Sequence, residues 1–244
     1  MSGTAKAFAR SAGHVVRNIV VLFLVAVFGA PFFGCAARSG GAADVQPDRL
    51  IIEEPGLHVD VVLPRTGAAP VDARLRVTAD ELVAQARAAE LPPGTPWTRE
   101  VFGEYESFRA GGSVWSFLLT YGLFVGGAHP FPVVETHVFD LSDGRPLTFG
   151  DVFMDDPASV EALASYVVAD LVNRQGLDAD WVAGAFGDPG KALSRFVLRE
   201  SGPLFVFPPY EVAPYVVGTV TVPLPWGVLQ DLVRPGFPAV HPGQ

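Results

Sequence analysis

The sequence predicts an α+β fold, in which antiparallel β-strands pack against two main helices and an apolar leader precedes them. Alternating apolar residues over 113–141 predict a long β-hairpin, whereas apolar residues at helical spacing predict helices over 71–90 and 157–175. Antiparallel strands with helices packed against them define an α+β protein. A hydrophobic content of 49% supplies enough apolar surface for the core of one large domain.

The hairpin at 113–141 is the expected centre of the sheet. Because side chains alternate along a strand, one face of its first arm is wholly apolar and the other is mixed. The apolar face comprises Trp115, Phe117, Leu119, Tyr121, Leu123 and Val125. Two glycines and two prolines within 126–132 interrupt the ladder and form the turn. We therefore expect a strand that is covered on one side and partly covered on the other.

Shorter elements complete the predicted domain. Strands are expected at 49–52, 57–63, 97–108, 195–198, 203–207 and 216–224. A capping box of Thr78 and Glu81 gives the first helix an alternative start, and Asp155 or Asp156 caps the second helix. Residues 177–194 indicate a short helix, and 226–233 predict a short amphipathic helix at the end of the domain.

The N-terminus predicts a targeting segment over 1–34. Its basic residues precede an apolar run at 19–33, which ends at Gly34 and Cys35. This pattern resembles the lipobox of bacterial lipoproteins, which implies a lipid attached to Cys35; Phe32 and Phe33 depart from the usual residues. The alternative is an uncleaved helix anchor, since 19–37 approaches the roughly 20 residues that span a bilayer. Both interpretations tether the protein to a membrane, facing outside the cytoplasm.

The remaining chain divides into a flexible tether at 35–48, a domain at 49–234 and a tail at 235–244. A split of the domain into subdomains at 49–110 and 111–234 is an option. The formal net charge is −9, and three basic residues but no acidic residue precede Cys35, so the domain itself is more acidic still. Such a surface repels nucleic acid and could attract a basic partner. One cysteine also excludes an internal disulfide.

Standard catalytic motifs are missing from the sequence: there is no G-x-S-x-G elbow, H-E-x-x-H pair or P-loop. A tight hairpin could bring His129, Glu135 and His137 together as a metal or acid–base set. The expected alternative is that His129 packs within its loop and His137 faces solvent. His58 and Asp60 are expected to face solvent as a chance pair. We therefore predict no catalytic residue, no metal and no cofactor.

The segment 208–215 contains three prolines, which exclude a helix or a regular strand ladder. Tyr210, Glu211 and Tyr215 lie on this stiffened loop. Tyrosines on a rigid loop provide contact area at little entropic cost, which favours recognition. The alternative is that both rings pack back on the sheet while Glu211 caps a backbone amide.

Three segments, at 121–129, 139–153 and 205–218, carry the signatures GGAH and PYE followed by APY. Together they resemble the extracytoplasmic domain of the lysozyme-sensing anti-sigma-V factor. That domain also occurs beside the catalytic domain of a peptidoglycan deacetylase and alone in lipoproteins of unknown function. The chain departs from the family at Phe124 and Val125. The resemblance covers 50–232 and contains the candidate binding residues Tyr121, His129, Tyr210, Glu211 and Tyr215.

The resemblance implies an α+β envelope domain, without the family's sigma-binding region or a deacetylase domain. We therefore expect a membrane-anchored lipoprotein that binds a lysozyme-like muramidase or peptidoglycan without catalysis. The alternatives are a glycan-modifying enzyme that uses His129 with nearby carboxylates, and a structural lipoprotein of an envelope complex.

Overall fold

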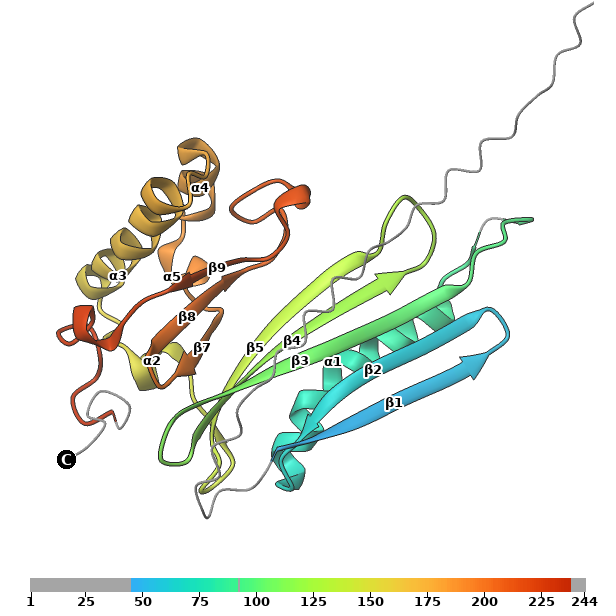
Figure 1. The fold of residues 1–244 in the computed structure, drawn as a ribbon, viewed down its shortest axis with the longest axis horizontal. Helices are drawn as coiled ribbons and strands as arrows, with labels where there is room; N and C mark the ends of the chain where they lie inside the picture. Colours follow the sequence, from blue (N-terminus) through green and yellow to red (C-terminus); the bar gives the residue numbers. More distant parts are fainter. Residues whose placement is uncertain (1–44, 92, 238–244) are drawn as a thin grey trace, which may run out of the picture. The chain divides into compact units, whose positions relative to one another are not determined.

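The computed structural model describes residues 45–91 and 93–237, which belong to one compact unit. Cys35, the leader and most of the tether and tail lie outside these residues. Figure 1 shows two sheets with helices against them, which confirms the predicted α+β class. Within the described residues, no helix is both long and apolar enough to cross a membrane.

The larger sheet has six strands in the order of the chain, of which Figure 1 labels β1 to β5. They are β1 (Gln46–Glu54), β2 (Leu57–Arg65), β3 (Arg99–Gly111), β4 (Val114–Phe124), β5 (Phe131–Asp140) and β6 (Arg145–Pro146). All neighbours pair antiparallel except β2 and β3, which are parallel. The parallel pair departs from the expected antiparallel sheet because helix α1 (Ala69–Ala88) carries the chain back to the end where β2 began.

Helix α1 begins at Ala69, with Pro70 in its first turn, so the alternative start at Thr78 is wrong. Its predicted apolar stripe is buried and comprises Val71, Leu75, Ala79, Leu82, Val83 and Ala86. The stripe packs with inward-facing residues of β2 to β4 to form a first core. The hydroxyl of Thr78 instead donates a hydrogen bond to Oε1 of Glu135 on β5, at 2.7 Å.

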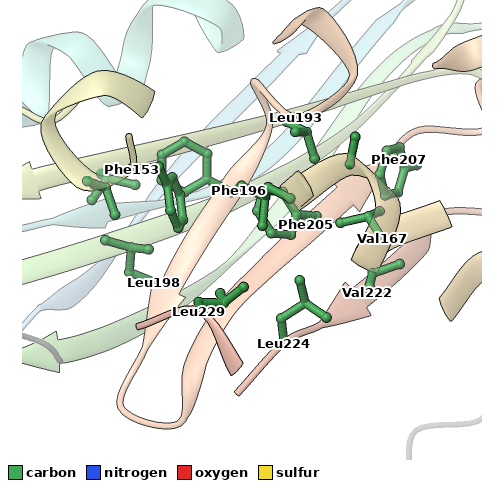
Figure 2. Close-up of a cluster of buried hydrophobic side chains, with 14 of the residues drawn as sticks. Phe153, Val167, Leu193, Phe196, Leu198, Phe205, Phe207, Val222, Leu224 and Leu229 are labelled. Carbon is green, nitrogen blue, oxygen red and sulfur yellow. The ribbon is translucent and has the colours of Figure 1, made fainter. Parts of the chain in front are cut away.

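The second sheet has three strands, β7 (Phe196–Arg199), β8 (Gly202–Phe207) and β9 (Val220–Pro223). It packs with α3 (Pro157–Ala169) in a second core, where Figure 2 shows the rings of Phe153, Phe196 and Phe205 together. Asp156 caps α3 by accepting a hydrogen bond from the backbone N–H of Ser159. A π-helical turn at Asp170–Arg174 completes the predicted second helix.

Other elements differ in extent from their predicted ranges. The stretch 177–194 forms two short helices, α4 (Ala179–Ala185) and α5 (Pro189–Ala192), and α2 (Phe149–Val152) precedes α3. The expected strand at 216–224 is only β9, because a 3-10 turn at Tyr215–Val217 ends at Gly218 with φ of 79°.

Strand β4 joins the two cores. Its apolar face is buried against α1, as the alternation predicts, whereas Val114 on the other face belongs to the second core. Ser116 on that face is fully buried, and its hydroxyl accepts a hydrogen bond from the N–H of Leu198 on β7 at 2.9 Å. The optional subdomain boundary at 110–111 falls at the β3–β4 turn, between strands that pair in one sheet.

Candidate functional site

The β4–β5 turn and the proline-rich loop meet through three aromatic rings. The rings of His129 and Tyr215 stack with centroids 4.2 Å apart and planes inclined by 21°. The ring of Tyr210 lies 5.4 Å from that of Tyr215, inclined by 33°. We call these three residues the aromatic ledge. Three of the predicted binding residues, which are far apart in the sequence, thus come together on the surface.

The loop holds Tyr210 in an unusual conformation. Tyr210 has φ of 72°, and it is the only residue other than glycine with positive φ in the part of the chain that the structure describes. The side chain is 57% exposed, so burial of the ring does not explain this conformation. The carbonyl oxygen of Tyr210 accepts a hydrogen bond from Nε1 of Trp181 on α4, at 3.3 Å.

Glu211 supports the loop from beneath instead of capping a backbone amide. Its carboxylate lies 2.8 Å from the guanidinium of Arg195, and both side chains are largely buried. Burial raises the pKa of Glu211, and the nearby positive charge of Arg195 opposes this shift. Glu211 therefore ties the loop to Arg195, whereas the ring of Tyr210 is exposed and that of Tyr215 is partly buried.

Tyr121 is not part of the aromatic ledge. It is buried in the first core, where its ring packs over Gly103, and a side chain on that glycine would collide with it. Burial chiefly raises the pKa of the Tyr121 hydroxyl, with Glu135 and Asp80 adding to the shift. The hydroxyl has no hydrogen-bond partner within the described residues. The alternation of β4 placed Tyr121 on the covered face, and the structure agrees with that placement.

His129 does not join His137 and Glu135. Nδ1 of His129 lies 2.9 Å from the carbonyl oxygen of Pro130, to which it donates, and its ring contacts Tyr215. His137 is mostly buried rather than solvent-facing, with Nε2 3.3 Å from Oε2 of Glu135. This hydrogen bond is the main cause that lowers the pKa of Glu135. Across residues 45–91 and 93–237, no group of three or more histidine, cysteine or acidic side chains could hold a metal ion.

His58 and Asp60 each pair with a residue of β1 instead of with one another. Nδ1 of His58 lies 2.8 Å from Glu53, and the carboxylate of Asp60 accepts two hydrogen bonds from Arg49. These are cross-strand pairs on an exposed sheet face, which contribute little to stability.

A shallow depression of about 400 Å³ lies beside the end of α1. Its one basic residue is Arg99, whose guanidinium donates to the carbonyl oxygens of Gly56 and Ala89. Because these contacts join α1 to the β1–β2 turn, the depression is a structural junction. Trp181, which donates to the carbonyl oxygen of Tyr210, was not predicted as a site residue, because the local sequence indicated only a short helix there.

A comparison with protein families matches residues 150–227 to a family described as "Protein of unknown function (DUF3298)". Among curated proteins, the chain is 26% identical over 113 residues to the peptidoglycan-N-acetylmuramic acid deacetylase PdaC of Bacillus subtilis. This match covers 46% of the chain and 24% of PdaC. The chain is 23% identical over 117 residues to Esterase Rv3036c of Mycobacterium tuberculosis, covering 48% of the chain and 51% of the esterase. The matches therefore span about half or less of these relatives.

Two crystal structures of DUF3298 proteins share the fold. One, from Bacteroides fragilis, has a TM-score of 0.56 at 16% identity and covers 80% of this chain and 96% of its own. The other, from Pseudomonas aeruginosa, has a TM-score of 0.57 at 17% identity and covers 84% of this chain and 100% of its own. Residues 150–227 therefore match the DUF3298 family model, and part of the chain is distantly similar to part of PdaC.

Proposed function

We propose that this protein is a non-catalytic binding module of the bacterial cell envelope, and that its aromatic ledge binds peptidoglycan. The observation that carries the proposal is the contact of the exposed rings of His129 and Tyr210 with the half-buried ring of Tyr215 between them. Aromatic rings bury large apolar area and keep polar edges, which suits sugar rings with apolar faces and hydroxyl rims. Their fixed position reduces the entropic cost of binding.

The setting of the ledge supports this role. The similarity to a peptidoglycan deacetylase of Bacillus subtilis favours a ligand in the cell wall. Lipidation of Cys35 would hold the domain on a membrane, with a short tether between the anchor and β1. A tethered module next to the wall needs only modest affinity, because its effective concentration there is high.

Binding fits the ledge better than catalysis through His129. The imidazole contacts a tyrosine ring and a main-chain carbonyl oxygen. General acid–base work needs a titrating partner or substrate atom within hydrogen-bond reach. His137 and Glu135 instead form a mostly buried hydrogen-bonded pair. The carboxylate of Glu135 also accepts a hydrogen bond from the hydroxyl of Thr78 on α1, so the pair connects β5 to that helix.

Sedimentation with purified peptidoglycan sacculi tests the proposal. The full chain, kept in mild detergent, should pellet with sacculi, and the double variant Tyr210→Ala and Tyr215→Ala should lose at least 10-fold in affinity. Tyr166→Ala is the matched control, because Tyr166 is an exposed tyrosine on α3 outside the ledge. Failure of the unaltered protein to pellet, or equal binding by the double variant, would reject the proposal.

A basic muramidase is a second candidate ligand. The protein carries a net charge of −9, and exposed Glu100, Glu104 and Glu106 follow one face of β3. Opposite charge accelerates encounter and makes it sensitive to salt. Retention of a basic muramidase at low salt, with release at high salt, would support this candidate, and no retention at either salt would reject it.

A further inference from the structure

We infer that Trp181 is a further residue of the binding surface, and that it acts by holding Tyr210 in a strained conformation. The inference rests on the proposed function, because it concerns the same ledge. It adds a third segment of the chain, helix α4, to the two loops that form the ledge.

The main chain of Tyr210 adopts a strained conformation. A residue with a β-carbon in the left-handed region is destabilised, because the β-carbon comes too close to the carbonyl oxygen of the same residue. Twelve glycines carry positive φ among the described residues, as expected for a residue that lacks a β-carbon. A tyrosine at φ of 72° therefore stands apart from them. Such strain persists only where the surroundings over-determine it, and it concentrates at functional sites.

Three contacts of the loop hold Tyr210 in this conformation. Nε1 of Trp181 donates to the carbonyl oxygen of Tyr210 at 3.3 Å, across 29 residues of chain. The N–H of Glu211 donates to the carbonyl oxygen of Pro208 at 3.1 Å and closes a turn around Tyr210. The ion pair of Glu211 with Arg195 ties the next residue to the second sheet. The tyrosine is therefore held on both sides of its main chain.

Trp181 is itself fixed and yet exposed. The backbone N–H of Trp181 donates to Asp178, which caps α4, and the next residue, Val182, is buried in the second core. The indole remains 39% exposed, although its N–H is satisfied. A ligand could therefore cover the exposed indole ring without leaving its N–H group unpaired, because that N–H already donates to Tyr210.

Trp181 lengthens the surface beyond the ledge. The ring contacts run in series from His129 through Tyr215 to Tyr210, and the hydrogen bond from Trp181 continues the series on α4. A surface that draws aromatic residues from three segments of the chain favours a ligand of several linked sugar rings over a monosaccharide. The inferred ligand is therefore an extended strand of linked pyranose rings.

The strain is tested without any ligand. Melting temperatures are compared for Tyr210→Gly and Tyr210→Ala, both of which remove the ring. The glycine variant should melt above the alanine variant, because glycine tolerates positive φ. The same pair at Tyr166, inside α3, should show the reverse order. An alanine variant at 210 that melts at or above the glycine variant overturns the inference.

The role of Trp181 is tested by Trp181→Phe, which keeps a ring and removes the indole donor. This change should shrink the melting difference between glycine and alanine at 210, whereas Trp97→Phe should leave it unchanged. Trp97 is a matched control, since it is 41% exposed and contacts Phe124. An unchanged difference in Trp181→Phe overturns the positioning role whether or not the protein binds a glycan.

Binding gives the second readout. Soluble wall glycans of two and four sugar rings serve as probes for the full chain. The unaltered protein should bind the four-ring probe more tightly than the two-ring probe. Trp181→Phe should bind both probes several-fold more weakly, and Trp181→Ala should also bind the two probes equally. If both variants bind as the unaltered protein does, the role of Trp181 is rejected while the proposed function stands. If the unaltered protein binds neither probe nor sacculi, the proposed function fails, and the melting comparison still decides the positioning role.

Discussion

Replacing Ser116 by alanine should destabilise the protein through an amide that the change leaves unpaired. Ser116 is fully buried on β4, and its hydroxyl accepts from the N–H of Leu198 on β7 at 2.9 Å. Strand β7 lies at the edge of its sheet, so this N–H points away from β8. The alanine side chain cannot accept a hydrogen bond, and the Leu198 amide becomes a buried donor without a partner.

The magnitude follows from the cost of such an orphaned group. An unsatisfied buried donor costs about 1–3 kcal/mol, and the small cavity left by the hydroxyl adds little to it. A domain of this size loses about 2–4 °C in melting temperature per kcal/mol. We therefore expect a fall of several degrees.

Urea unfolding followed by far-ultraviolet circular dichroism measures the change. The midpoint should fall while the slope of the unfolding free energy against urea stays constant, because the surface exposed on unfolding is unchanged. Ser201→Ala is the control, since Ser201 is exposed in the β7–β8 turn. A loss below about 0.5 kcal/mol for Ser116→Ala would contradict the role of this hydrogen bond in joining the sheets.

Three further outcomes are expected. Gly202→Ala should abolish soluble expression, because a β-carbon there would lie 1.9 Å from the carbonyl oxygen of Leu224 and φ is 140°. The pKa of Glu135 is lowered by His137, so its stabilising contribution is present above the ordinary carboxyl pKa and is lost as pH falls through the lower, folded-state pKa. Melting temperature should therefore depend less steeply on pH in the acid range for Glu135→Gln than for the unaltered protein. Cys35→Ala should remove incorporation of a labelled fatty acid in cells, and unchanged labelling would refute lipidation at that residue.

Local patterns predicted the elements well where one face of an element is buried. The alternation in β4 and the stripe of α1 are both consequences of packing against a single neighbour, so the sequence carries them directly. The parallel pairing of β2 with β3 was not predictable, because the direction of pairing depends on where α1 places the chain.

The candidate site was predictable in its residues but not in its geometry. His129 and Tyr215 were identified separately, and their stacking depends on how two distant loops meet. Tyr121 was a candidate by resemblance alone, although its place on the apolar face of β4 already indicated burial. Glu211 found its partner in Arg195 across 16 residues, a contact that no local rule contains.

Strand β4 is shared by both cores, and its turn with β3 at Gly111 and Gly112 marks where the chain could be broken. Each fragment from such a break would hold part of an unfinished sheet, with the missing part in the other fragment. The two fragments, made separately, should stay unfolded alone and reassemble when mixed. The domain could therefore be used for fragment complementation, in which the recovery of folded structure reports that the two fragments have associated.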